Sequence, residues 1–459
     1  MIKLHHSLDG KKLPVGSQKP QVVKQMIHKV TRARKQTDKK LTEYTTALKA
    51  GKKKDVRKIA DQYMKSYSGR LAAVVDENRD RQEDQRYTLS RCHKLAAELK
   101  PHQPCEEKVW LSLKAKKSGG RRVIQKFGIR RRSAQRMVRT LIQFRITPPE
   151  WQFTLQGVQK AIREVKEFDP SPDIWVARLD ITDFYGSFTR GGLNELLWEI
   201  PNSITKNTLL GEGSNTHYYH TYNFPTDVYT EAARQGVPQG SVVSPLIGAL
   251  AVSEISWEPD DGVVLINYVD DFLILAPSKE KLEKATFALD SAVTHELPGG
   301  NFHLKHEQFG TFSEGVEFLG HHLFFEDGVM VIEPTPSAIS RLHDNVQVMH
   351  EKIEAARKRY LTKGGGKLRY VFVSRLAELF SHMRGWRESF SECDPVFVDG
   401  VVKDIHTDIG EFMHGTNLTI EEVIKASSLR QGGWRYSEMS DETELDLIHE
   451  DEGDEEELN

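Results

Sequence analysis

The chain has 459 residues, of which 38% are hydrophobic and 28% are charged. This length predicts roughly two to four structural units with a sizeable core, and no apolar run approaches the roughly 20 residues that a membrane-spanning helix needs. The composition therefore argues against a membrane protein. The N-terminal sequence MIKLHHSLDGKK lacks the apolar core and small-residue cleavage site of a secretory signal, which predicts a cytoplasmic protein.

The formal net charge of −2 hides an uneven distribution along the chain. Residues 441–459 contain 11 acidic residues and no Lys or Arg, whereas residues 1–60 contain 17 basic and 4 acidic residues. Outside the acidic tail, 64 basic residues stand against 55 acidic ones, a net charge of +9. This pattern is typical of a phosphate-binding body with an acidic tail, and a solvated helix face with a disordered solubility tail is the equally weighted alternative.

The three cysteines are scattered and form no C-x-x-C pair. Cys92, Cys105 and Cys393 therefore predict neither a disulfide framework nor a zinc knuckle.

Residues 20–99 carry apolar side chains at helical spacing among many Lys, Arg and Glu residues, which predicts a helical N-terminal region. Residues 109–128 contain two short apolar runs around a basic Gly-Gly sequence, a pattern typical of a β-hairpin. Strand-like and helix-like segments then alternate to about residue 334, and the pattern turns helical again with a break at the glycines 364–366. The predicted domains are a basic helical N-terminal extension (1–104), a mixed α/β region (105–334), a helical region (335–430) and an acidic tail (431–459).

The sharpest local signal is Tyr268-Val269-Asp270-Asp271, which lies between apolar runs at residues 263–266 and 272–276. Two strands are expected to meet at this carboxylate turn. Adjacent acids at the tip of an apolar hairpin repel each other unless a cation binds there, and a pair of Mg²⁺ ions is the common solution. A surface turn that contains Asp-Asp is the alternative, because Asp is a normal turn residue.

A third carboxylate, Asp180, ends a strand-like run at residues 175–180. Phosphoryl transfer needs little covalent help from the protein, but it needs two cations about 3.5–4 Å apart. Three carboxylates on two adjacent strands can hold such a pair. Taken alone, Asp180 would be interpreted as a helix cap that follows a strand.

Residues 235–245, QGVPQGSVVSP, form a Gly- and Pro-containing loop that leads into the apolar helix LIGALAVSEI. Such a loop lets the backbone approach a ligand closely, and N–H groups near a helix start suit phosphate and sugar contacts. An ordinary loop with a helix cap would explain the Ser and Pro residues. It would not explain the Pro-Gln-Gly sequence and its position between the two acidic segments.

The order LDITDFY, QGVPQGSVVSP, YVDD and EFLGHH resembles motifs A, B, C and E of reverse transcriptases. The resemblance extends upstream to SGGRRVI, which is similar to the fingers hairpin, and downstream into the helical region, so it covers roughly residues 105–415. It leaves the N-terminal region unexplained. The resemblance implies an α+β right-hand polymerase with fingers, palm and thumb, an antiparallel catalytic palm sheet, a helical N-terminal extension and a helical thumb.

The resemblance also implies roles for individual residues at the metal and nucleotide sites. Asp180 and Asp270 are expected to be direct metal ligands with Asp271 as the accompanying acid, and Ile181 completes the predicted metal site. The expected contacts to the incoming nucleotide are made by Lys114, Lys116, Arg122, Tyr185, Gln239, Gly240 and Lys305.

Three of these assignments are more specific. Tyr185 takes the position of the aromatic gate beside the 2′ position of the sugar. Lys305 takes that of the acid that protonates the departing pyrophosphate, an exposed surface lysine being its alternative interpretation. The primer grip is matched by residues 318–321, namely Phe318, Leu319, Gly320 and His321, and a plain β-turn is the alternative there.

The subfamily is indicated by finer features. The QGxxxSP form of motif B is similar to group II intron and retron enzymes, yet the sequence contains no NAxxH or VTG signature of retrons and no zinc or HNH endonuclease segment. A helical N-terminus with an acidic tail resembles the bacterial unknown-group reverse transcriptases, many of which act in anti-phage defence. Residues 217–220, HYYH, precede motif B and are expected to form a loop and not a metal site.

The resemblance thus predicts an RNA-directed DNA polymerase that adds dNTPs to a primer 3′ end with two Mg²⁺ ions, Mn²⁺ being the alternative ion. The expected partners are an RNA template, for which a dedicated noncoding RNA is one choice, and a DNA or RNA primer. No membrane partner is expected, and formation of a homo-oligomer is left as an open alternative. One alternative is a retron or group II intron-type enzyme. A second is an RNA-dependent RNA polymerase, whose motif C typically has Gly-Asp-Asp. A third is a non-catalytic RNA-binding or splicing factor, against which the intact carboxylates argue.

Overall fold

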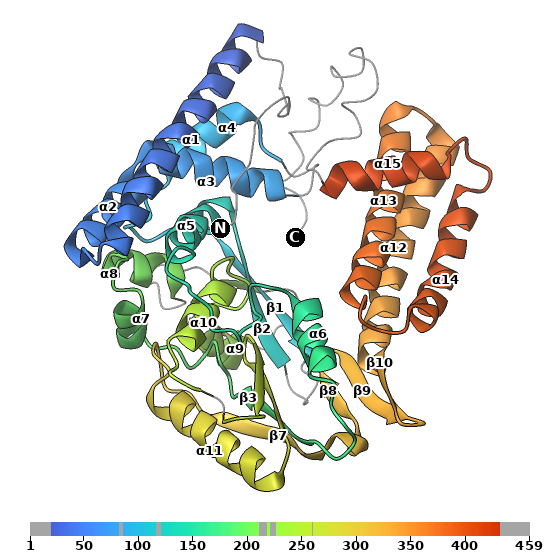
Figure 1. Cartoon of the computed structure of the whole chain (residues 1–459). Coiled ribbons are helices and arrows are strands. Elements are labelled where there is room, and N and C mark those ends of the chain that lie inside the picture. The colour runs from blue at the N-terminus through green and yellow to red at the C-terminus, as the bar shows by residue number, and fades with distance from the viewer. Residues whose placement is uncertain are drawn as a thin grey trace. The chain divides into compact units, whose positions relative to one another are not determined.

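Helices and strands are distributed along the chain largely as the sequence predicts (Figure 1), and the computed structural model describes residues 20–81, 86–115, 121–210, 218–220, 226–258 and 260–431. In chain order the helices are α1 (Pro20–Lys49), α2 (Lys53–Lys65), α3 (Tyr67–Asp80), α4 (Leu89–Glu98), α5 (Ile129–Ile142), α6 (Val158–Phe168), α7 (Arg190–Leu196), α8 (Asn202–Ile204), the π-helix η2 (Thr205–Leu209), α9 (Thr226–Arg234), α10 (Ser244–Ser253), α11 (Lys279–His295), the 3-10 helix η3 (Phe312–Glu314), α12 (Pro336–Lys363), α13 (Gly366–Ser389), α14 (Pro395–Met413) and α15 (Ile420–Gln431).

The strands form three sheets. In chain order they are β1 (Val109–Ala115), β2 (Arg121–Phe127), β3 (Trp175–Ile181), β4 (Tyr218–His220), β5 (Val264–Tyr268), β6 (Asp271–Ala276), β7 (Leu304–Thr311), β8 (Val316–Phe318), β9 (His321–Glu326) and β10 (Val329–Pro334). Their order is β2-β1-β4 in the first sheet, β5-β6-β3-β7 in the second and β10-β9-β8 in the third. The mixture of helices and sheets confirms the predicted α+β class.

The chain divides into two compact units. Unit 1 comprises Met1–Leu155, Leu179–Ile274 and Glu283–Glu307, and unit 2 comprises Gln156–Arg178, Leu275–Leu282 and Gln308–Asn459. The N-terminal helices α1 to α4 thus belong to the same unit as the β1–β2 hairpin, and strands β3, β6 and β7 run from one unit into the other along the chain.

The N-terminal helices confirm the helical pattern of residues 20–99, and α1 shows the reason. Its buried side chains recur every three or four residues, which is the spacing of one helix face: Val30, Ala33, Thr37, Leu41, Tyr44 and Ala47. Helix α3 is capped by the residue before it, Ser66, whose hydroxyl accepts a hydrogen bond from the Gly69 amide at 3.1 Å.

A buried carboxylate joins these helices to α5. The side chain of Glu77 on α3 is 2% exposed, and it accepts hydrogen bonds from Arg132 and from Arg136, whose Nη2 lies 3.0 Å from Glu77 Oε2. Arg136 also pairs with Asp80. A buried charge is costly unless it is paired and hydrogen-bonded, so this cluster fixes α3 against α5 in one arrangement.

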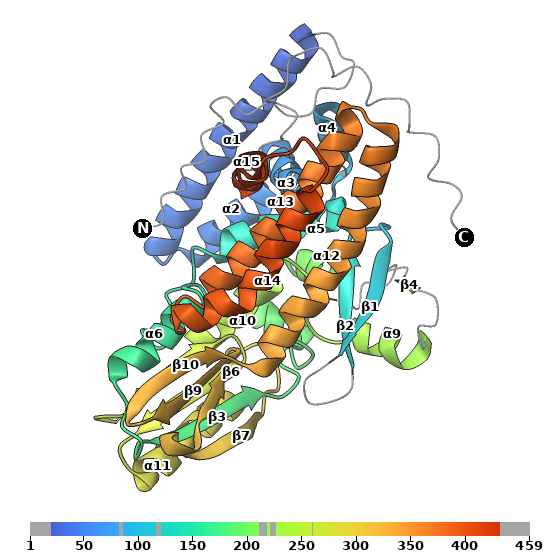
Figure 2. The same cartoon turned by 90° about the vertical axis from the view of Figure 1, so that its right-hand side faces the viewer.

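The predicted hairpin of residues 109–128 is confirmed in its strands. β1 and β2 pair antiparallel from Val109↔Phe127 to Ala115↔Arg121, and they lie side by side in Figure 2. Lys116 and the basic Gly-Gly sequence, like the acidic tail at 441–459, lie outside the described residues. The loop expected at residues 217–220 was wrong for its last three residues, because β4 pairs in parallel with β1; its two tyrosines favour strand geometry, and β1 offers an edge for pairing.

Unit 2 contains the third sheet and the helices predicted for residues 335–430. Thr335 caps α12 through a hydrogen bond from the Ala338 amide at 3.3 Å, Pro336 takes its first position, and the helix ends before Gly364, whose φ is +65°. Helix α12 packs against α13 and α14 (Figure 2). The break predicted at the glycines 364–366 is confirmed.

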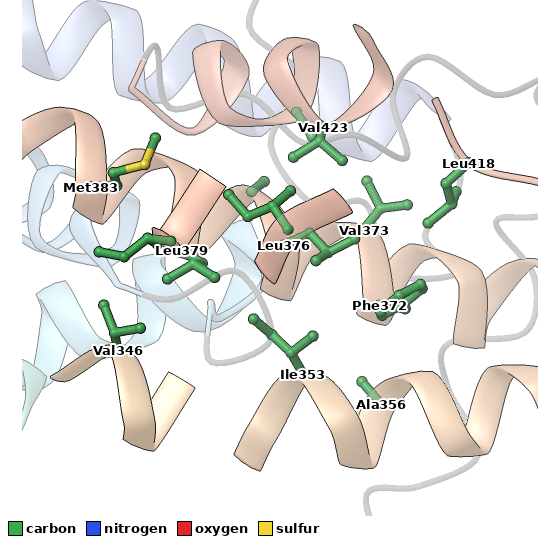
Figure 3. Close-up of a cluster of buried hydrophobic side chains, with 14 of the residues drawn as sticks. Val346, Ile353, Ala356, Phe372, Val373, Leu376, Leu379, Met383, Leu418 and Val423 are labelled. Atoms are coloured by element: carbon green, nitrogen blue, oxygen red, sulfur yellow. The ribbon is translucent and has the colours of Figure 1, made fainter. Parts of the chain in front are cut away.

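The core of these helices consists of aliphatic and aromatic side chains. Figure 3 shows part of it, with Val346 and Ile353 of α12 facing Leu379 and Leu376 of α13. Helix α14 contributes Val402, Ile405 and Ile409, and α15 contributes Val423 and Ala426. No described helix combines the length and the apolar character needed to cross a bilayer.

Candidate active site

The two adjacent carboxylates lie where β5 and β6 meet. Val269 and Asp270 form the turn between the strands, and Asp271 is the first residue of β6. The five residues that follow Asp271, Phe272 to Ala276, are fully buried. The expectation of a carboxylate turn between two apolar strands is therefore confirmed, and both acids are partly buried and not free surface residues.

Asp180 lies on the neighbouring strand, β3. In the second sheet β3 is adjacent to β6, and the Ile181 amide donates a hydrogen bond to the Asp270 carbonyl at 3.0 Å. Residue 180 is partly buried, whereas Leu179 and Ile181 on either side of it are buried, as the alternation of a strand requires. One backbone hydrogen bond thus brings together two sequence segments that are 90 positions apart.

The electrostatics of the turn follow from burial and like charge. Burial raises the pKa of the Asp270 carboxyl, the charge of Asp271 raises it further, and Arg122 and the backbone N–H of Asp270 counteract in part, which leaves the pKa at about 6. An acid that is buried beside a second acid is costly to ionise. A cation bound at the turn would therefore stabilise the ionised carboxylates.

A metal site is consistent with the donor chemistry of these residues. Within the described ranges, no group of three or more His, Cys, Asp or Glu side chains is arranged to hold a metal ion. The carboxylates of Asp180, Asp270 and Asp271 and the backbone oxygen of Ile181 are nevertheless the hard oxygen ligands that Mg²⁺ and Mn²⁺ take in proteins. A bound divalent ion would offset both the burial and the charge of Asp271, the two causes that raise the pKa of Asp270.

The loop at residues 235–245 is tied to the segment that follows Asp180. The Val237 amide donates to the Tyr185 carbonyl at 2.8 Å. Gly236 has a φ of +58°, and a Cβ at this position would lie 2.0 Å from the same carbonyl oxygen. Only glycine fits here, because both the backbone conformation and the space exclude a side chain.

The same loop is tied to the β1–β2 hairpin. The Gln125 amide on β2 donates to the Gln239 carbonyl at 2.7 Å, and the buried side-chain amide of Gln125 donates to the Ala233 carbonyl at 2.7 Å. Gly240 has a φ of +107°, and a Cβ there would lie 2.3 Å from the Gln125 carbonyl oxygen. The predicted Pro-Gln-Gly contact residues therefore lie against the hairpin that carries Arg122.

Tyr185 lies close to both the acids and the hairpin. Burial raises the pKa of its hydroxyl, the charge of Asp270 raises it further, and Arg122 lowers it. Its ring centroid is 5.3 Å from that of Phe184, which is 2% exposed and packs against Phe188 and Phe302. The structure thus places Tyr185 at the edge of an aromatic core, facing the charges of the site.

The described cations of the predicted triphosphate clasp lie on one hairpin. Lys114 on β1 is directly opposite Arg122 on β2, so the two side chains are on the same face. Like charges in directly opposed positions are destabilising unless an anion lies between them. This pairing suits a bound phosphate, whereas the third predicted cation, Lys116, lies outside the described residues.

Lys305 lies on β7, which is adjacent to β3 in the sheet. Its ammonium group is 2.5 Å from Glu307 Oε1, and its side chain is 52% exposed. Two residues before Lys305, the His303 carbonyl accepts a hydrogen bond from the Thr182 amide at 3.0 Å, which ties this segment to the one that follows Asp180. The alternative of an exposed surface lysine is therefore as compatible with this position as the proton-donor role.

The predicted primer-grip residues form the β8–β9 turn in unit 2. Leu319 and Gly320 have φ values of +50° and +85°, and Phe318 pairs with His321 across the two-residue turn. Phe318 and His321 are buried, and burial lowers the pKa of the His321 imidazole, whose ring centroid is 4.7 Å from that of Phe390. Only Leu319 and Gly320 are accessible to a partner at this turn.

Sequence reasoning missed the residues that support the carboxylate turn. The Val269 amide donates to Thr154 Oγ1 at 2.8 Å, and the buried Asn267 side chain donates to the carbonyls of Val269 and Asp271 at 3.2 Å each. The signal for Asn267 was a polar residue inside the apolar strand β5. Thr154 gave no signal, because it lies in an irregular segment 115 positions before its partner.

Comparison with known proteins identifies a domain. Residues 114–323 match the family model described as "Reverse transcriptase (RNA-dependent DNA polymerase)", which is slightly less than half of the chain. No curated protein matches the sequence. The matched range contains the carboxylate turn, Asp180, Tyr185 and the loop at 235–245.

Solved structures with a similar chain include telomerases and a viral polymerase. Apo telomerase from Candida tropicalis, truncated from its C-terminal domain, matches with 14% identity and a TM-score of 0.32, over 54% of this chain and 61% of the telomerase chain. Telomerase from Candida albicans in complex with a TWJ fragment of telomeric RNA matches with 11% identity and a TM-score of 0.31, over 76% and 65% of the two chains. The RNA-dependent RNA polymerase of bacteriophage phi12 matches with 12% identity and a TM-score of 0.30, over 72% and 53%.

The present chain thus spans less than two thirds of the length of each of these three proteins. The class of protein follows from the fold and the family match: the fold is that of a right-hand polymerase that combines helices with sheets, as predicted. More particularly, residues 114–323 match a reverse-transcriptase domain.

The raised pKa of Asp270 predicts a pH-dependent effect on stability. Because the pKa is about 6 in the folded protein and 3.8 in an unperturbed Asp side chain, ionisation of Asp270 opposes folding increasingly as the pH rises from about 4 to about 6. The effect is complete above pH 6 and small below pH 3.8, where the group is mostly protonated in both states. In metal-free buffer Asp270→Asn should therefore raise the free energy of unfolding at pH 7.5 by roughly 2–3 kcal/mol and leave it unchanged near pH 3.5.

Urea titrations at the two pH values measure this difference. The control is Asp61→Asn, which removes a partly buried carboxylate that pairs with Lys65 on α2 and with His102. Equal destabilisation by Asp270→Asn at both pH values would contradict the electrostatic description of the turn.

Proposed function

We propose that this protein is an RNA-directed DNA polymerase that adds dNTPs to a primer 3′ end with the help of two divalent metal ions, Mg²⁺ or Mn²⁺. The observation that carries the proposal is the hydrogen bond between the Ile181 amide and the Asp270 carbonyl, which places Asp180 next to the Asp270-Asp271 pair inside the matched domain. A non-catalytic RNA-binding or splicing factor has no need for three adjacent acids, one of them with a raised pKa.

The residues of the site have separate tasks in this reaction. When bound, two divalent ions would activate the attacking 3′ oxygen and neutralise the charge on the leaving pyrophosphate. Asp180, Asp270 and Asp271 provide the negative charge that holds them. Arg122 and Lys114 pair with the triphosphate from the hairpin, and guanidinium and ammonium groups suit this task because hydrogen bonds between charged groups are the strong ones.

The loop at 235–245 positions the nucleotide between these groups. It is bonded to Tyr185 through Val237 and to β2 through Gln239, so the charges of the hairpin and of the acids have a fixed separation in unit 1. Preorganised charges of this kind are the main source of catalysis in phosphoryl transfer. A nucleotide bound to the Gln239-Gly240 backbone would have its sugar beside the Tyr185 ring.

The proposed partners are an RNA template, a DNA or RNA primer and dNTPs. Support comes from the cations that α1, α2 and the turn between them expose in unit 1, which are Lys29, Arg32, Lys35, Lys39, Lys49, Lys52, Lys53, Lys54, Arg57, Lys58 and Lys65. A basic surface of this kind binds nucleic-acid backbones without regard to sequence. The proposal includes a dedicated noncoding RNA as the template.

The choice of nucleotide is tested through Tyr185. Its ring is proposed to exclude a 2′-hydroxyl, so Tyr185→Ala should admit ribonucleotides and lower the dNTP-to-rNTP ratio of kcat/KM by at least about tenfold, the equivalent of roughly 1.4 kcal/mol. Use of dNTPs should fall less, because Arg122 and the acids are unchanged. Single-nucleotide incorporation on an RNA template measures both ratios.

The matched control is Phe184→Ala, which removes a neighbouring ring that is buried in the core. It should lower the stability of the protein without a selective gain for ribonucleotides. An unchanged ratio in Tyr185→Ala would refute the gate assignment. A parent protein that prefers rNTPs would refute the reverse-transcriptase proposal and favour an RNA-dependent RNA polymerase.

We also propose a biological role in bacterial anti-phage defence, which rests on the resemblance of the helical N-terminus and acidic tail to the unknown-group enzymes. A strain that carries the gene with its neighbouring DNA should then show phage plating reduced by at least about tenfold, and the protection should be lost with Asp270→Asn, since loss of a ligand stops synthesis. Plaque counts on matched strains measure this. Protection that survives the substitution would remove DNA synthesis from the role.

A further inference from the structure

The carboxylate turn contains a backbone conformation that its own residue type disfavours. Val269, the residue before Asp270, has a φ of +61°. A β-branched residue with positive φ is an outlier, because its Cβ crowds the backbone, and such a conformation persists only where the surrounding structure enforces it. The surrounding structure must therefore hold Val269 in place.

A short segment, residues 151–154, provides that restraint, and we call it the strap. The Val269 amide donates to the hydroxyl of Thr154 at 2.8 Å. The strap also pairs with the end of β5, because the Asn267 amide donates to the Trp151 carbonyl and the Phe153 amide donates to the Asn267 carbonyl, both at 2.8 Å. Three hydrogen bonds thus connect the strap to the turn and to the strand that precedes it.

The strap is itself anchored in the core of unit 1. Phe153 is 2% exposed and Gln152 is fully buried. The Gln152 side-chain amide donates to the Ala249 carbonyl on α10 at 2.9 Å. Helix α10 follows directly on the loop at 235–245, so the strap connects the carboxylate turn with the helix that carries this loop.

The opposite side of the turn is held by Asn267. Its side-chain amide lies 3.2 Å from the carbonyls of both Val269 and Asp271, and the residue has no exposed surface. Thr154 therefore binds the N–H of Val269 while Asn267 binds its C=O. The peptide groups before and after Val269 are fixed from two sides, and the second of these leads directly to Asp270.

We infer that Thr154 is a positioning residue for the polymerase reaction, which acts by holding Val269 in the left-handed conformation that aims Asp270. The inference rests on the proposed function, since it names the device that orients one of its acids. Thr154 contacts neither nucleotide nor primer in this scheme. Its effect should appear in the chemical step, because a misplacement of about 1 Å at a catalytic group can cost about a hundredfold in rate.

The test compares two substitutions of Thr154. Thr154→Val has nearly the same shape but no hydroxyl, so the Val269 N–H loses its acceptor, whereas Thr154→Ser keeps the acceptor. We expect Thr154→Val to lower kcat about tenfold to a hundredfold with the KM for dNTPs changed less than about twofold, because the Arg122 clasp is untouched. Thr154→Ser should retain most of the kcat of the parent. The matched control is Thr362→Val on α12, which removes an exposed hydroxyl bonded to the Lys358 carbonyl and should leave kcat unchanged.

A second variant separates positioning from general stability. Glycine adopts positive φ without strain, so in a Val269→Gly background the restraint is no longer needed. Thr154→Val should then cost less than about threefold in kcat, a non-additive result, and the double variant should fold even where Thr154→Val alone does not. The inference would be overturned if Thr154→Val kept the full kcat of the parent. It would also be overturned if the loss of kcat in the double variant equalled the product of the two single losses, or if the double variant failed to fold. A parent protein without polymerase activity would instead overturn the proposed function.

Discussion

The rest of the site depends on one electrostatic constraint, the partial burial of two adjacent carboxylates. Asp270 and Asp271 lie at the junction of two buried strands, and burial, together with the charge of Asp271, raises the pKa of Asp270 to about 6. Such a pair is unfavourable in a metal-free fold and becomes favourable when cations bind. The surrounding structure keeps the pair in place in spite of this cost. Strand β3 adds Asp180 through the Ile181 amide, and Thr154 and Asn267 hold the strained residue between the strands.

Backbone hydrogen bonds connect most of the segments that form the site. The loop at 235–245 bonds to the Tyr185 carbonyl through Val237 and to Gln125 on β2 through Gln239. Gly236 and Gly240 are required at these contacts because a Cβ would lie within 2.3 Å of a carbonyl oxygen at either position. The segment that follows Asp180, Tyr185 included, and the β1–β2 hairpin are thereby held together in unit 1 by backbone hydrogen bonds to this loop.

Much of the fold was predictable from local pattern, and the reasons for success and failure are physical. Helical spacing predicted α1, and the glycines 364–366 predicted the end of α12, because both signals lie within a few residues. The strand β4 was missed because its pairing with β1 is more than 100 positions distant. Asp180, Asp270 and Tyr185 were predicted as neighbours from motif order, and the Ile181 and Val237 hydrogen bonds bring their segments together. Thr154 could not be predicted, since its only signal is the three-dimensional approach to Val269. The burial of His321 was missed because its packing contact with Phe390 has no signal in local spacing.

The most direct measurement is extension of a DNA primer on an RNA template by purified protein, with the parent compared with Asp180→Asn and Asp270→Asn over a titration of Mg²⁺ and Mn²⁺. The account predicts metal-dependent addition of dNTPs by the parent and a loss of at least about a thousandfold in each variant at every metal concentration, with template binding within about twofold of the parent, because each substitution removes one anionic ligand and leaves the fold intact. Undiminished extension by either variant would contradict the assignment of these carboxylates.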